Sequence, residues 1–352
     1  DAIEQIEVIT GDLACELFGS KFSEFRVASG ALANLYAFMA TCKPGDKIIA
    51  PPPTIGGHVT HHKAGAAGLY GLETISAPID SDNYTVDLAA LEKLAQEVKP
   101  KLITIGGSLN LFPHPVKEIR KIADSVGAYL LFDAAHQCGL IAGKAWPQPL
   151  AEGAHLMTFS TYKSLGGPAG GLIVTNDAAL AEKLDAIAYP GLTANFDAAK
   201  TAALGITLQD WLAVGSDYAK MMIETAKKLA SELDKLGLPI FAKEKGFTTS
   251  HQFGIIANQF GGGQTASKKL AKAGLLACGI NIPGPTVEGD NNAIRIGTPE
   301  IVRIGMKPEH MAELADLIYR GLTLTDPTPV QAEVITFRKK FSGVHYTVDT
   351  AK

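Results

Sequence analysis

The sequence predicts an α/β fold, with a larger domain built on a mostly parallel sheet followed by a smaller α+β domain. Of its 352 residues, 46% are apolar and 19% are charged, so the chain can bury a large core and is not mainly disordered. Over the first two thirds, short apolar runs alternate with helical patterns, which favours a parallel sheet. After about residue 208 this alternation ends, which indicates a second domain.

Each expected element rests on a local pattern. Runs of large and β-branched apolar residues that end at turn residues indicate strands, and apolar residues three or four positions apart indicate helices. Strands are expected at 47–50, 102–105, 128–132, 156–159, 171–174, 253–257 and 293–296. Helices are expected near the start of the chain, after Ser29, over 88–98 and 116–126, from 178, and over 218–236, 267–273, 308–322 and 330–341. We expect the larger domain to span 1–210 and the smaller one 211–352.

Charge and cysteine content exclude several classes of protein. With 32 basic and 36 acidic residues, the net charge of −4 predicts no broad nucleic-acid-binding surface. No stretch resembles a membrane span or a signal peptide, so no membrane partner is expected. The four cysteines form no CxxC pair, which predicts reduced thiols in a cytoplasmic protein. Because the sequence opens at Asp1 inside a helical pattern, we expect further residues upstream.

Two charged residues follow predicted strands, where ligands of parallel sheets bind. Lys163 lies among small and hydroxyl side chains before a glycine-rich turn. There it could lose solvent and become a Schiff-base nucleophile, whereas a surface lysine is the simpler interpretation of such a residue taken alone. Asp133 directly follows the strand 128–132. It could keep the pyridine nitrogen of a cofactor protonated, or it could cap a turn.

Three further segments supply candidates. His58, in the segment 56–62, could stack on an aromatic cofactor or transfer a proton. Ser29, Gly30 and Ala31 begin a predicted helix and could form a phosphate cup. Arg295 lies inside an apolar strand, so it needs either an acidic partner or a substrate carboxylate. Taken in chain order, with Lys163 following Asp133 by 30 positions, these residues indicate a pyridoxal 5′-phosphate (PLP) enzyme that acts on an amino acid.

Five segments resemble the serine hydroxymethyltransferase family, which has the fold of aspartate aminotransferase. They are GGHVTH at 56–61, IADSVGAYL at 122–130, FDAAHQCGLIAG at 132–143, KSLGGP at 163–168 and IRIGTP at 294–299, within a resemblance that runs from about residue 1 to about 322.

The resemblance implies a role for each candidate residue. Lys163 would hold PLP covalently, Asp133 would pair with its ring nitrogen, His58 would stack on the ring and His136 would lie near the ring hydroxyl. The remaining implied residues are Ser29, Gly30 and Ala31 at the phosphate, Ser108, Ser160 and Tyr162 beside the cofactor, and Arg295 at the substrate carboxylate.

The chain also departs from the family pattern. Tyr162 stands where the family has a histidine before the lysine, Ala169 replaces an arginine, and Ala31 replaces a serine of the phosphate cup. The family's Gly-Gly, which reaches the phosphate of the neighbouring subunit, appears here as Ala194 and Asn195.

Two further departures concern folate. Pro285 falls at or near a folate-contacting asparagine, and this sequence does not contain the family's N-terminal folate segment. Both weigh against tetrahydrofolate use and point to aldol chemistry without folate.

We therefore expect PLP-dependent cleavage or formation of the Cα–Cβ bond of β-hydroxy-α-amino acids, by a hydroxymethyltransferase or a folate-independent aldolase. The fold places active sites at subunit interfaces, so we expect a homodimer or a larger homo-oligomer. His58 is a candidate for the base. Three alternatives remain open: another PLP reaction such as transamination, a non-catalytic family member, and a metal hydrolase that uses His58, His61, His62 and His136.

Overall fold

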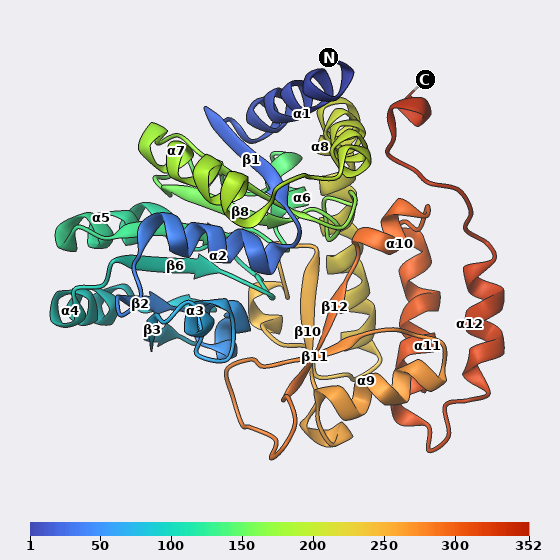
Figure 1. The fold of residues 1–352 in the computed structure, drawn as a ribbon. Coiled ribbons are helices and arrows are strands. Elements are labelled where there is room, and N and C mark those ends of the chain that lie inside the picture. Colours follow the sequence, from blue (N-terminus) through green and yellow to red (C-terminus); the bar gives the residue numbers. More distant parts are fainter. Residues whose placement is uncertain (352) are drawn as a thin grey trace. The chain divides into compact units, whose positions relative to one another are not determined.

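The computed structural model describes residues 1–351, which form two compact units (Figure 1). The first unit comprises Asp1–Pro52, Gly57–Ser108 and Pro113–Ser216. The second comprises Pro53–Gly56, Leu109–Phe112 and the chain from Asp217 onward.

The first unit contains a seven-stranded sheet in the order β1-β9-β8-β7-β6-β2-β3. Only β9 runs antiparallel to its neighbours, β1 and β8, so the expected mostly parallel sheet is confirmed. The strands β6 to β9 are buried except for the half-buried Tyr129 at the start of β7, as expected for a sheet covered on both faces. In sheet order the strands span Phe22–Val27, Gly171–Thr175, Leu156–Ser160, Tyr129–Asp133, Leu102–Gly106, Lys47–Ala50 and Glu73–Ser76.

Four helices of the first unit begin with capping side chains that the sequence supplies. Ser29 caps α2 through its hydroxyl, Asp87 caps α4 and Asp177 caps α7 with their carboxylates, and Asp1 forms a capping box with Glu4 at α1. The helices α1 to α7 of this unit span Ala2–Phe18, Gly30–Thr41, Ala66–Leu69, Leu88–Val98, Val116–Val126, Cys138–Ala142 and Ala178–Ala186. A short ribbon of β4 (Ile79–Asp80) and β5 (Thr85–Val86) completes the unit.

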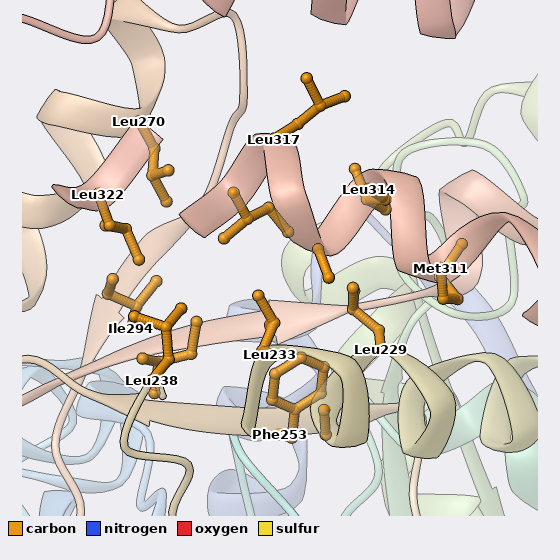
Figure 2. Close-up of a cluster of buried hydrophobic side chains, with 14 of the residues drawn as sticks. Leu229, Leu233, Leu238, Phe253, Leu270, Ile294, Met311, Leu314, Leu317 and Leu322 are labelled. Atoms are coloured by element: carbon orange, nitrogen blue, oxygen red, sulfur yellow. The ribbon is translucent and has the colours of Figure 1, made fainter. Parts of the chain in front are cut away.

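The second unit packs helices against a three-stranded antiparallel sheet in the order β10-β12-β11. Figure 2 shows its core, where Leu229 and Leu233 of the long helix α8 face Phe253 and Ile294 of the sheet and Leu314 of α11. The strands are Gln252–Ile256, Ala293–Gly297 and Cys278–Ile280. The helices are α8 (Ala198–Lys235), whose first half belongs to the first unit, α9 (Gly263–Lys272), α10 (Pro299–Arg303), α11 (Met311–Thr323) and α12 (Val330–Arg338).

Sequence patterns located most elements within a few residues, with two kinds of error. The helix expected at 218–236 begins 20 residues earlier, because Asp197 caps it and an alanine-rich stretch extends it. The sheet strands β1, β3 and β11 were not expected, since they are half-buried edge strands without a long apolar run. All four cysteines carry free thiols. Across residues 1–351, no helix combines the length and the apolar character that crossing a membrane requires.

Truncation of the core residue Leu233 should destabilise the second unit. Leu233 is 0% exposed, so Leu233→Ala leaves a cavity and should lower the free energy of unfolding by about 2–5 kcal/mol. Leu276→Ala is the matched control, because Leu276 is 91% exposed and should change that free energy by less than about 0.5 kcal/mol. Urea unfolding of both variants measures the difference, and equal effects would contradict the described core.

Candidate active site

One cleft of the first unit brings together ten of the residues predicted to bind the cofactor. It encloses about 110 Å³ and lies beyond the carboxyl ends of β6, β7 and β8. The parallel register of β6 and β7 brings the loops after these strands to one edge, where α2 also begins. The cleft is lined by Ser29, Gly30, Ala31, Asn34, His58, Gly107, Ser108, Asp133, Ala135, His136, Ser160, Tyr162 and Lys163.

The loop that carries Lys163 is fixed to the loop that carries His136. Ser164, next to the lysine, donates its hydroxyl hydrogen to the carbonyl oxygen of His136 and accepts the backbone N–H of Gly139 at 2.9 Å. The contact with Gly139 is buried and the one with His136 is partly buried, so competition with water is limited. The two strand-end loops therefore present their side chains to the cleft as one unit.

The start of α2 contributes the second wall of the cleft. The hydroxyl of Ser29 accepts the backbone N–H of Leu32 at 3.2 Å, which ends the strand-to-helix turn and starts the helix. Gly30 packs so closely on β8 that a Cβ atom there would lie 2.1 Å from the hydroxyl oxygen of Ser160. The first N–H groups of a helix have no partner within the helix and attract anions. Small residues at this turn leave those groups accessible to a phosphate.

Asp133 is a buried carboxylate held by three hydrogen-bond donors. Its Oδ2 accepts from His61 Nε2 at 2.8 Å and from Asn34 Nδ2 at 3.1 Å, and its Oδ1 accepts the N–H of Ala135 at 3.0 Å. Burial by itself would raise the pKa of Asp133. The hydrogen bonds from His61 and from the N–H of Ala135, together with electrostatic attraction by the side chains of His61 and His58, outweigh burial and hold that pKa well below its usual range. The carboxylate is therefore ionised and suited to a cationic N–H partner.

Two of the residues that donate to Asp133, Asn34 and His61, were not predicted as cofactor-site residues from the sequence. Asn34 lies one helical turn after Gly30 on α2, so helical spacing could have placed it on the same face. His61 appeared only in the metal-site alternative, although it lies one short helical turn after His58. Its Nδ1 is buried and has no hydrogen-bond partner among the residues that the structure describes.

The histidines of the segment 56–62 are directed to different partners. His58 Nδ1 lies 2.8 Å from Thr60 Oγ1, His61 binds Asp133, and His62 Nε2 lies 3.0 Å from the carbonyl oxygen of Pro51. Burial also lowers the pKa of His62. Within residues 1–351, no group of three or more His, Cys, Asp or Glu side chains is arranged to hold a metal ion. This arrangement does not support the metal-hydrolase alternative.

Arg295, the predicted carboxylate-binding residue, belongs to the second unit. It lies on the central strand β12, opposite Gly254 and Cys278, and is half-buried. His251, at the start of this sheet, is buried. Burial lowers the pKa of His251 to about 3, and the positive charge of Arg295 contributes to the shift. His251 is therefore neutral beside the arginine.

Comparisons with known proteins agree with the resemblance seen in the sequence. A family model described as serine hydroxymethyltransferase matches residues 1–318. An alpha-methylserine aldolase from Variovorax paradoxus is 66% identical over 348 residues, which cover 99% of this chain and 79% of that protein. An alpha-methylserine aldolase from Ralstonia is 56% identical over 98% of this chain and 79% of that protein. A serine hydroxymethyltransferase from Aeropyrum pernix is 38% identical over 99% of this chain and 80% of its own length.

A solved structure supports the fold. The crystal structure of L-threonine transaldolase from Pseudomonas fluorescens superposes with a TM-score of 0.90 at 25% identity, covering 99% of this chain and 80% of that one. The predicted family and fold class are therefore confirmed.

Acidification should destabilise the protein through His251. The pKa of His251 is about 3 in the folded chain, and that of an unfolded histidine is about 6.5. Below about pH 6.5 the unfolded state therefore takes up a proton that the folded state does not, and stability is lost as the pH falls toward 3. At about pH 5 this amounts to about 2 kcal/mol relative to about pH 8, a loss that His251→Gln should lack. Urea unfolding of both proteins at the two pH values measures it, and an identical pH dependence in the variant would contradict the assignment.

Proposed function

The chain belongs to the serine hydroxymethyltransferase family, whose enzymes break and form the Cα–Cβ bond of β-hydroxy-α-amino acids with PLP, and we propose that this member is an α-methylserine aldolase that needs no folate. The observation that carries the proposal is the 66% identity to a protein of that name over 99% of the chain, against 38% for a serine hydroxymethyltransferase. The departures at Tyr162 and Ala169 adjoin the resemblance segment at 163–168, and Ala31 lies in the predicted phosphate cup, which supports a divergent activity.

The groups around the cleft fit PLP. The ionised Asp133 suits a protonated ring nitrogen, and the N-terminus of α2 with Ser29 and Gly30 suits the phosphate. Lys163 supplies an amine for the aldehyde carbon, and His58 supplies a flat ring at the same cleft. When bound, PLP would accept the electron pair left on Cα as the Cα–Cβ bond breaks.

The remaining residues act by binding and orientation. Arg295 is proposed to bind the substrate carboxylate, because a guanidinium matches a carboxylate with two parallel hydrogen bonds. Fixing the carboxylate also fixes the direction of the Cα–Cβ bond. Asp133 keeps its negative charge throughout and so favours the protonated ring nitrogen. Ser164, by joining the loops of Lys163 and His136, keeps the amine at a constant place in the cleft.

A substrate panel tests the proposal. We expect α-methylserine to give alanine and formaldehyde without tetrahydrofolate, and serine and threonine stereoisomers to react at least about tenfold more slowly, since one misplaced group costs on the order of 1–3 kcal/mol. Formaldehyde and the amino-acid product are measured for each substrate, with and without tetrahydrofolate.

The control for this panel is Lys163→Ala. This variant should lose the visible absorbance of bound PLP and at least about a hundredfold of the activity, because the amine and its proton transfers are gone. Activity that appears only with tetrahydrofolate, or on serine alone, would instead support the second candidate, a serine hydroxymethyltransferase, which the 38% identity to such proteins favours. Unchanged absorbance in the variant would remove Lys163 from its role.

We further propose that the protein is a homodimer. Large apolar side chains are exposed on α1 (Val8, Ile9) and on α8 (Ile206). The two helices are adjacent, because Thr10 Oγ1 donates to the carbonyl oxygen of Thr201 at 3.1 Å. Exposed apolar groups that gather on one part of a surface are typical of interfaces between subunits.

Light scattering coupled to size-exclusion chromatography should give twice the chain mass of 37.1 kDa. Replacement of Ile206 by Glu should shift the equilibrium toward monomer, because it places a charge in the proposed interface. A monomer with full activity would contradict the dimer. A dimer that Ile206→Glu leaves intact would contradict the assignment of this surface.

A further inference from the structure

A buried hydrogen-bond network connects Asp133 and His58, the two groups proposed to contact the cofactor ring. Asn34, which is 3% exposed, lies at its centre. Its Nδ2 is 3.1 Å from Asp133 Oδ2 and 2.9 Å from Thr60 Oγ1, and its Oδ1 accepts from Thr158 Oγ1 at 2.7 Å. All three partners are buried as well.

Only one orientation of the Asn34 amide satisfies this network. If the amide were rotated by half a turn, Oδ1 would face the oxygen of the ionised Asp133, and two acceptors would stand in contact without a hydrogen between them. In the observed orientation both amide hydrogens have acceptors and Oδ1 receives the hydroxyl hydrogen of Thr158. Thr158, from β8, thus fixes which end of the amide faces the carboxylate.

The second amide hydrogen of Asn34 determines which nitrogen of the His58 ring carries a hydrogen. Because Thr60 Oγ1 accepts from Asn34, its own hydrogen is available for His58 Nδ1 at 2.8 Å. The backbone N–H of Thr60 also donates to the same Nδ1, at 3.3 Å. A nitrogen that receives two donors carries no hydrogen, so the hydrogen of the His58 ring lies on Nε2.

We propose that Asn34 is a positioning residue that sets the hydrogen pattern of Asp133 and His58, the two groups proposed to contact the cofactor ring. One amide hydrogen helps to hold Asp133 as an ionised acceptor. The other, relayed by Thr60, holds His58 as the neutral tautomer with hydrogen on Nε2. The proposal rests on the PLP site proposed above. On this proposal His58 stacks and donates from Nε2, so it is not the base, a role for which the sequence had made it one candidate.

The first test reads the tautomer of His58 by ¹⁵N NMR of the PLP-bound protein with labelled histidine. The His58 signals are assigned by their loss in His58→Asn. From about pH 6 to about pH 9, wild-type Nδ1 should give the signal of an unprotonated acceptor and Nε2 that of a protonated nitrogen. A hydrogen on Nδ1 in the wild type overturns the proposal without any appeal to a variant.

Variants then separate the two branches of the network. Asn34→Leu, of similar shape, removes both donated hydrogens. It should weaken PLP binding by roughly tenfold to a hundredfold and shift the His58 tautomer ratio by roughly fivefold. Thr60→Val should shift the tautomer ratio to a similar extent but change PLP affinity less than about threefold, and Thr60→Ser, which keeps the hydroxyl, should restore the wild-type ratio.

The outcomes distinguish this proposal from the proposed function. If Asn34→Leu keeps both the wild-type tautomer and the wild-type PLP affinity, Asn34 has no positioning role, whatever the substrate. If the NMR pattern is as expected but α-methylserine is not cleaved, the network stands and the substrate assignment fails. If the wild-type protein binds no PLP, the proposed function and the positioning role both fail.

Discussion

The candidate site depends on the negative charge of one buried carboxylate, that of Asp133. Asp133 lies at the end of β7 with almost no exposed surface, and a carboxylate there is costly unless donors surround it. Three donors, from His61, Asn34 and the backbone of Ala135, supply that compensation. The buried side chains of His61 and Asn34 thus support this one charge.

The fold brings those donors together because of where parallel strands end. β6, β7 and β8 run side by side, so the residues that follow them share one edge of the sheet with the start of α2. This convergence requires tight packing. Gly30 lies so close to Ser160 that a Cβ atom on residue 30 would not fit. Glycine at this turn thus serves the close approach of helix and strand, in addition to any contact with phosphate.

Related chains with the same fold carry different activity names, so fold alone does not decide the reaction. The groups proposed to bind the cofactor ring, Lys163, Asp133 and His58, match the family pattern. Among the departures from that pattern, Ala31 lies in the predicted phosphate cup, and Tyr162 and Ala169 lie on either side of the segment 163–168 that begins with Lys163. Where the groups proposed to bind the cofactor stay the same and their surroundings differ, the substrate can change while the reaction class stays the same.

The sequence by itself determined the α/β class and the family and supplied the candidate site residues, because apolar periodicity and short motifs such as KSLGGP are local. It did not determine the hydrogen-bond partners of those residues. Asn34 and Asp133 are 99 positions apart, and His61 and Asp133 are 72 apart. Such pairs have no local signature, so only the assembled sheet, which aligns β7 and β8 beside α2, decides which donors meet the carboxylate and which nitrogen of His58 carries its hydrogen.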